Sequence, residues 1–151
     1  MGLKIVYWNT TNSLSNIEQA LEDSREFDVV AFQEPYRNRT TMSVYCNERY
    51  HRIFDEDRIM LFVYKRHPVM LWSQQVGRDW CNITFTINDI DILQRRPSGE
   101  ALAKETLTIW SIYSEGYDTS KLWENPIYEL VVRPKLPGQY ILVGDFNLYH
   151  L

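Results

Sequence analysis

Hydrophobic residues at the start of the chain follow a strand, helix and strand order. Residues 4–8 and 27–34 are almost continuously apolar, which is typical of strands covered on both faces. Between them, apolar residues recur at helical spacing behind a capping box formed by Ser15 and Glu18. This pattern predicts a helix that begins at Asn16 and ends near residue 24. A strand–helix–strand unit of this kind usually pairs its two strands in parallel.

From residue 50 onward, short apolar runs and clean alternation predict strands with short connections. The expected strands cover residues 50–54, 59–65, 69–72, 81–87, 107–113 and 140–143. The last of them is expected to be buried on both faces, and a helix is expected over residues 126–132, with Pro126 in its first turn. Residues 36–49 and 94–105 have no clear period and are expected to be loops. The whole chain is predicted to form one layered α/β (α+β) domain with much sheet.

Polar side chains follow four of these strands, at the point where each strand ends. Ligands of layered α/β folds collect at such ends. At the last of these strand ends, Gly144 permits a close approach of the backbone to a neighbouring segment. If the backbone stays extended after Gly144, the side chains of Asp145 and Asn147 point the same way. The residues concerned are Asn9, Glu34, Tyr113, and Asp145 together with Asn147.

These residue types suit metal-assisted phosphoester hydrolysis. A hard ion such as Mg²⁺ or Mn²⁺ takes oxygen ligands, often one or two carboxylates with water and phosphate, and Glu34 can supply such a carboxylate. Asp145 can orient a water and accept its proton, while Asn9 and Asn147 add hydrogen bonds without negative charge. Tyr113 can donate to a phosphate oxygen. Taken singly, each of these residues is also an ordinary turn former, strand end or buried aromatic residue.

The motifs resemble those of the endonuclease/exonuclease/phosphatase superfamily, which has the DNase-I-like fold. Gln33-Glu34-Pro35 and Gly144-Asp145-Phe146-Asn147 each close an apolar strand, and Trp8-Asn9 and Ile112-Tyr113 match two further landmarks in the right order. The set is most similar to the endonuclease domains of LINE-type retrotransposons, which nick DNA. The resemblance implies a four-layer α/β sandwich, a DNA substrate and a nuclear location.

The same resemblance implies a role for each strand-end residue. Glu34 would bind the metal and Asn9 would support the metal and phosphate shell. Asp145 would position or activate the attacking water with the help of Asn147, and Tyr113 would touch the phosphate. Two alternatives stay open: a superfamily phosphatase acting on small phosphoesters, and a non-catalytic binding module that keeps the fold.

The sequence departs from the family pattern at two places. Thr11 stands where some relatives carry an acid, and the Asp-His pair that the family bears near its C-terminus has no counterpart up to Leu151. Residues 1–151 are therefore expected to be the N-terminal part of such a domain. Loss of a proton-transfer group typically slows hydrolysis by about 10²–10⁴-fold, so this chain alone should be inactive or very weak. Uncovered sheet surface should also favour homo-oligomers.

Composition narrows the partners and the compartment. The net charge of −4 argues against a general basic surface for nucleic acid, although local basic clusters occur at residues 37–39, 65–67 and 95–96. Each cluster is expected to be a solvated loop. Two cysteines, Cys46 and Cys81, indicate free thiols in a reducing compartment. No apolar run approaches the roughly 20 residues of a membrane span and no signal peptide is recognised, so an intracellular protein without membrane contact is expected.

Overall fold

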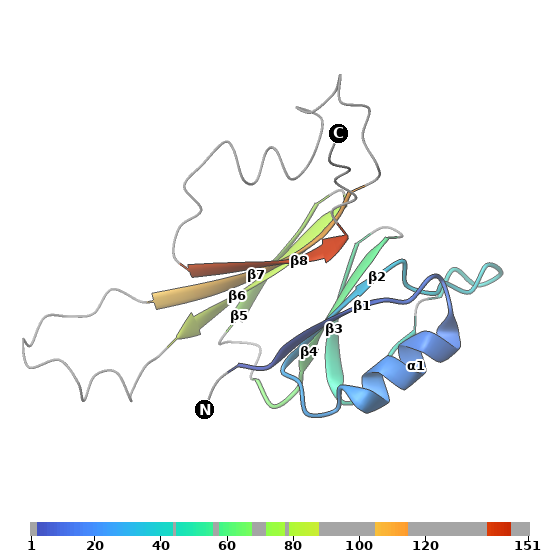
Figure 1. The fold of residues 1–151 in the computed structure, drawn as a ribbon, viewed down its shortest axis with the longest axis horizontal. Coiled ribbons are helices and arrows are strands. Elements are labelled where there is room, and N and C mark those ends of the chain that lie inside the picture. Colours follow the sequence, from blue (N-terminus) through green and yellow to red (C-terminus); the bar gives the residue numbers. More distant parts are fainter. Residues whose placement is uncertain are drawn as a thin grey trace, which may run out of the picture.

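A computed structural model describes residues 3–43, 45–55, 58–67, 72–77, 79–87, 105–114 and 139–145. These residues form one helix and eight strands (Figure 1). In chain order the elements are β1 (Ile5–Asn9), α1 (Leu14–Asp23), β2 (Val29–Gln33), β3 (Tyr50–Asp55), β4 (Ile59–Tyr64), β5 (Trp72–Gly77), β6 (Trp80–Ile87), β7 (Glu105–Tyr113) and β8 (Gln139–Asp145).

The strands form two four-stranded sheets, with the orders β1-β2-β4-β3 and β5-β6-β7-β8. Strands β1 and β2 are parallel, with Ile5 opposite Val29, which confirms the pairing predicted for the opening unit. Strands β7 and β8 are also parallel, whereas the other neighbours are antiparallel. The strand-end residues therefore lie at the carboxyl ends of two parallel pairs, β1 with β2 and β7 with β8.

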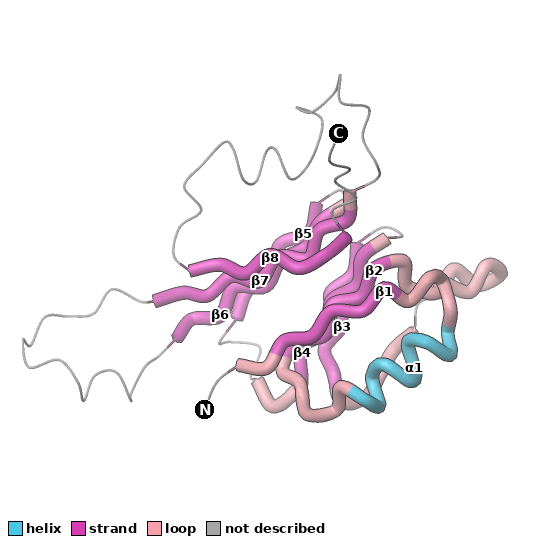
Figure 2. The backbone as a smooth tube through the Cα atoms, viewed as in Figure 1, coloured by secondary structure: helices cyan, strands magenta, loops and turns pink. Residues whose placement is uncertain are grey.

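The two sheets pack face to face, and α1 covers the outer face of the first sheet (Figure 2). Alternate residues of the first sheet, such as Ala31 and Leu61, meet Ile83 and Ile109 of the second in one fully buried core. The residues between them face α1 and form a second core, made of Ile17, Ala20, Leu21, Val30, Phe32, Tyr50, Met60 and Phe62. Burial on both faces explains why β2 is apolar except for Gln33 at its end, as its nearly continuous apolar sequence predicts.

Helix α1 begins earlier than the capping pattern indicates. Ser13, whose backbone is extended, is the N-cap, and its hydroxyl accepts a hydrogen bond from Asn16 N at 3.3 Å. Ser15 instead contacts the Ser13 hydroxyl at 3.0 Å. The capping box of Ser15 and Glu18 was thus the wrong choice, because the extended residue before the helix is the one that can reach the open N–H groups.

The later strands depart from prediction in two places. Strand β5 starts at Trp72, where the expected strand of residues 69–72 ends, and residues 69–71 lie outside the described segments. Strand β8 is not buried on both faces: Tyr140 is 50% exposed and Ile141 is 38% exposed. An edge strand has a neighbour on one side only, and β8 is the edge of its sheet. Association through such surface stays a prediction.

The fold class is mixed α/β and mostly sheet, as expected. The described residues make one helical layer and two sheets, so they do not show the four-layer DNase-I-like sandwich that the resemblance implies. The helix expected over residues 126–132 lies outside the described residues. Within the described segments, no helix has the length and apolar character needed to cross a membrane.

A buried ion pair closes the end of the first sheet where β2 begins. The Asp28 side chain is 4% exposed, and it accepts hydrogen bonds from Lys4 N at 2.8 Å and Arg66 Nε at 2.9 Å. His67 Nε2 lies 2.6 Å from the same carboxylate. Burial raises the pKa of Asp28, but these hydrogen bonds and the Arg66 charge outweigh it and hold the pKa below its ordinary value of 3.8. Residues 65–67 form the exposed turn that was expected for this basic cluster, and Arg66 and His67 in addition contact Asp28.

Candidate functional site

The inner faces of both sheets carry polar side chains at one end of the core. In β7 the buried Ile109 is followed by Ser111 and Tyr113 on the same face, and in β8 the residue opposite Tyr113 is Asp145. From the first sheet, Gln33 Nε2 donates to Ser111 Oγ across the interface at 3.0 Å, and both residues are fully buried. This hydrogen bond ties the two sheets together directly beneath the strand ends.

Gly144 sets the position of Asp145 against β7. Its φ is +149°, a conformation that side chains rarely adopt, and a Cβ there would lie only 1.9 Å from Ile112 O. The close backbone approach predicted for Gly144 is thus present. In this register Asp145 is the residue of β8 that lies opposite Tyr113.

Glu34 is held in an unusual backbone conformation at the end of β2. Its φ is +48°, which non-glycine residues seldom adopt. The surrounding loops stabilise this conformation: Glu34 N donates to Arg58 O at 2.7 Å, and Glu34 O accepts from Asn12 N and from Thr10 Oγ1, both at 2.8 Å. Tyr113 Oη donates to Glu34 Oε1 at 3.3 Å, so the predicted residues Glu34 and Tyr113 meet. Strained backbone of this kind concentrates at functional sites.

Tyr7 belongs to the same group, although the sequence analysis did not select it. Burial raises the pKa of Tyr7, and the negative charges of Asp145 and Glu34 raise it further, with a smaller effect from Tyr113. Both carboxylates therefore lie near one phenol, which stays protonated and able to donate. Period-2 alternation along β1 could have indicated that Tyr7 faces the inter-sheet core, because Tyr7 lies on the same face of the strand as the inward-pointing Ile5.

Asn9 has a simpler role in the structure. It lies opposite Gln33 at the end of β1, is exposed, and its Oδ1 accepts a hydrogen bond from Thr11 N at 2.9 Å. Asn9 is therefore a turn former, which was the alternative interpretation of this residue from the sequence. Asn147, the other predicted amide, lies outside the described residues.

Arg58 adds a positive charge that no sequence pattern indicated. Its guanidinium carbon lies 5.3 Å from the centre of the Tyr113 ring, and its Nε lies 3.9 Å from Asp79 Oδ1. It follows the acidic turn between β3 and β4, which in the sequence looks only like a strand boundary. Proximity to Glu34 arises from the backbone hydrogen bond between the two residues.

The gathered side chains offer hard oxygen donors and proton donors around one end of the inter-sheet core. They comprise two carboxylates, two phenols and one guanidinium: Glu34, Asp145, Tyr7, Tyr113 and Arg58. This donor set fits a magnesium ion, which proteins usually hold by one or two carboxylates with water completing the shell. Across the described segments, no group of three or more His, Cys, Asp or Glu side chains is gathered in a metal-binding arrangement.

Comparisons with known proteins found no relative of this chain. No family model, no curated protein and no solved structure matches the chain.

Proposed function

We propose that this chain carries the metal-binding half of a phosphodiesterase site, of the kind used by endonuclease/exonuclease/phosphatase proteins to nick DNA. The observation that carries the proposal is the meeting of Glu34, from the end of β2, with Tyr113 and Asp145, from the ends of β7 and β8. Carboxylate oxygens are the ligands by which proteins usually hold Mg²⁺, so two carboxylates at one end of the inter-sheet core support the proposal.

Each residue has a defined part in the proposed reaction. Glu34 would hold the ion, which when bound supplies positive charge to a phosphate oxygen. Asp145 would orient a water molecule and accept its proton as the water oxygen bonds to phosphorus, while the P–O bond to the leaving oxygen breaks and that oxygen takes a proton from solvent. Tyr113 donates its O–H to a phosphate oxygen, and Arg58 offsets negative charge that develops on the phosphoryl group. Asn9 stabilises the turn that carries Thr10, whose hydroxyl holds the Glu34 carbonyl.

The proposal extends to fold and location. The two sheets and α1 would be three of the four layers of the sandwich, and a retrotransposon-type endonuclease would be nuclear. Both points derive from the motif resemblance, and the packing of the sheets supports the first.

Metal titration tests the site without depending on turnover. Isothermal calorimetry with Mg²⁺ and Mn²⁺ is expected to detect binding to the chain and at least a tenfold loss with Glu34→Gln. Glu22→Gln is the matched control, since Glu22 is an exposed glutamate on α1 that pairs with Arg25 and Arg49. Equal binding by the wild type and Glu34→Gln would refute the site. Release of phosphate from inositol phosphates, with no nicking of supercoiled plasmid, would favour a phosphatase instead.

A further inference from the structure

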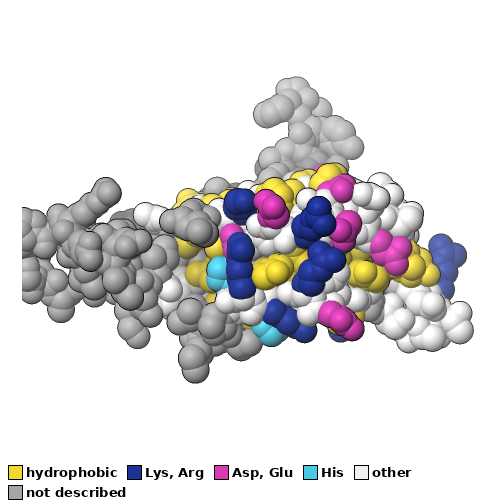
Figure 3. Space-filling model, turned by 90° about the horizontal axis from the view of Figure 1, so that it is seen from below, with side chains coloured by type: hydrophobic (Ala, Val, Ile, Leu, Met, Phe, Trp, Pro, Cys, Tyr) yellow, Lys and Arg dark blue, Asp and Glu magenta, His cyan; other side chains and the backbone are white. Residues whose placement is uncertain are grey.

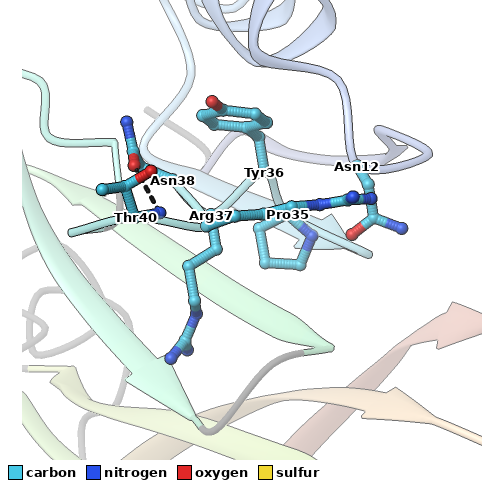
Figure 4. A pocket seen from close by; sticks show the side chains of 7 residues that line it. Asn12, Pro35, Tyr36, Arg37, Asn38 and Thr40 are labelled. Atoms are coloured by element: carbon cyan, nitrogen blue, oxygen red, sulfur yellow. Dashed lines mark hydrogen bonds between the residues drawn. The ribbon is translucent and has the colours of Figure 1, made fainter. Parts of the chain in front are cut away.

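A pocket of about 660 Å³ opens next to Glu34, on the loop that follows β2. It is lined by Asn12, Pro35, Tyr36, Arg37, Asn38, Arg39 and Thr40 (Figure 4). The lining contains two guanidinium groups, three neutral polar side chains and no carboxylate. We propose that this pocket binds the phosphate backbone of a nucleic-acid strand, next to the phosphodiester held at Glu34.

Charge distinguishes this loop from the rest of the molecule. The chain has a net charge of −4, yet residues 35–47 contain two arginines and no acidic residue. On the face shown in Figure 3, by contrast, Lys and Arg side chains alternate with Asp and Glu. Guanidinium groups bind phosphate oxygens through two parallel hydrogen bonds, so a local pair of arginines can bind a polyanion despite an acidic whole.

Internal hydrogen bonds make the loop compact before any ligand arrives. Asn38 Oδ1 accepts from Thr40 N at 2.9 Å and from Thr41 N at 3.1 Å, and Asn38 O accepts from Met42 N at 2.8 Å. Tyr36 packs against the core beneath α1, and Figure 4 shows it leaving the loop on the side opposite to Arg37. An anchored backbone reduces the entropy lost when the arginines bind.

The pocket and the proposed catalytic residues are joined by the backbone itself. Asn12, which lines the pocket, donates its N–H to Glu34 O at 2.8 Å. Arg37 is three positions after Glu34, a span of at most about 11 Å in extended chain. Successive phosphates of one strand rise about 3.4 Å along a duplex axis, so Arg37 can reach a phosphate only a few nucleotides from the scissile one. A small phosphoester would not extend to both places.

This inference rests on the proposed function for its substrate class, but its test does not need catalysis. Binding of a fluorescent DNA duplex would be measured by anisotropy in EDTA, over a series of salt concentrations. The double variant Arg37→Gln/Arg39→Gln is expected to bind at least tenfold more weakly, with the salt dependence reduced by about two charges. Arg25→Gln/Arg49→Gln, which removes equal charge from two arginines paired with Glu22, should bind as the wild type does.

The outcomes separate this proposal from the proposed catalytic site. Unchanged DNA binding by Arg37→Gln/Arg39→Gln, or an equal loss in the control pair, would overturn the pocket. Displacement of the duplex by inorganic phosphate or inositol hexakisphosphate at the same phosphate concentration would also overturn it, since the pocket would then bind any anion. If Glu34→Gln keeps DNA binding while the arginine variant loses it, the pocket stands even where no metal-dependent hydrolysis is found.

Discussion

Replacing Gly144 with alanine tests the link between backbone packing and the site. A Cβ at this position would lie 1.9 Å from Ile112 O, whereas unstrained C···O contacts begin at about 3.3 Å, so β8 would have to move by about 1.4 Å. Backbone at φ +149° adds about 1–3 kcal/mol of strain for a residue other than glycine. Loss of one ladder hydrogen bond adds about 1 kcal/mol. Gly144→Ala is therefore expected to lower the free energy of unfolding by about 2–4 kcal/mol.

Urea denaturation followed by tryptophan fluorescence would measure this loss. In a thermal melt followed by the same fluorescence, Tm is expected to fall by roughly 5–15 °C. Each kcal/mol lost from the free energy of unfolding lowers Tm by about 2–4 °C in a chain of this size. Gly77→Ala is the matched control: its Cβ would meet the Trp80 indole at 2.2 Å, and a side chain can rotate away. The free energy of unfolding of Gly77→Ala is therefore expected to fall by only about 1 kcal/mol.

The reasoning would be refuted by a Gly144→Ala protein with wild-type stability. That result would mean that β7 and β8 can separate at little expense, and that Asp145 is not positioned by the approach of Gly144 to Ile112. An equal loss in Gly77→Ala would point instead to a general sensitivity of this sheet to added methyl groups.

Three further substitutions test the surroundings of the site. Because the folded pKa of Asp28 is depressed, its stabilisation is present above about pH 4 and is lost as the pH falls through that range, so Asp28→Asn should flatten the acid limb of a urea-stability profile; a wild-type limb would contradict this. Ser111→Ala should lower the free energy of unfolding by about 1–3 kcal/mol, because it removes the partner of the buried Gln33 amide, and a neutral result in the same urea experiment would show that the amide finds another partner. Thr10→Val should lower the free energy of unfolding by about 1 kcal/mol and weaken metal binding measured by calorimetry, since the Thr10 hydroxyl donates a hydrogen bond to Glu34 O. Unchanged metal affinity would show that this hydrogen bond does not position Glu34.

Local pattern was sufficient for most of the elements. Apolar runs and alternation identified β1, β2, β4, β6 and β7 within a few residues, and helical spacing identified α1. Each of these signals reports which side chains are buried along a short stretch, and burial repeats with the period of the element that causes it. They also identified β8 as a strand, but its expected burial on both faces was wrong, because this apolar sequence occupies an exposed edge position.

Sequence alone also selected Glu34, Tyr113, Asp145 and the close approach at Gly144, because residue type and strand-end position are local properties. Only the tertiary structure brought Glu34 to Tyr113, 79 residues later in the chain, and added Tyr7 and Arg58 beside them. It also made Asn9 a turn former and joined the arginine loop to Glu34. These relations depend on strand order, register and the packing of one sheet on another, which are set by contacts between distant segments and leave no periodic trace in either segment.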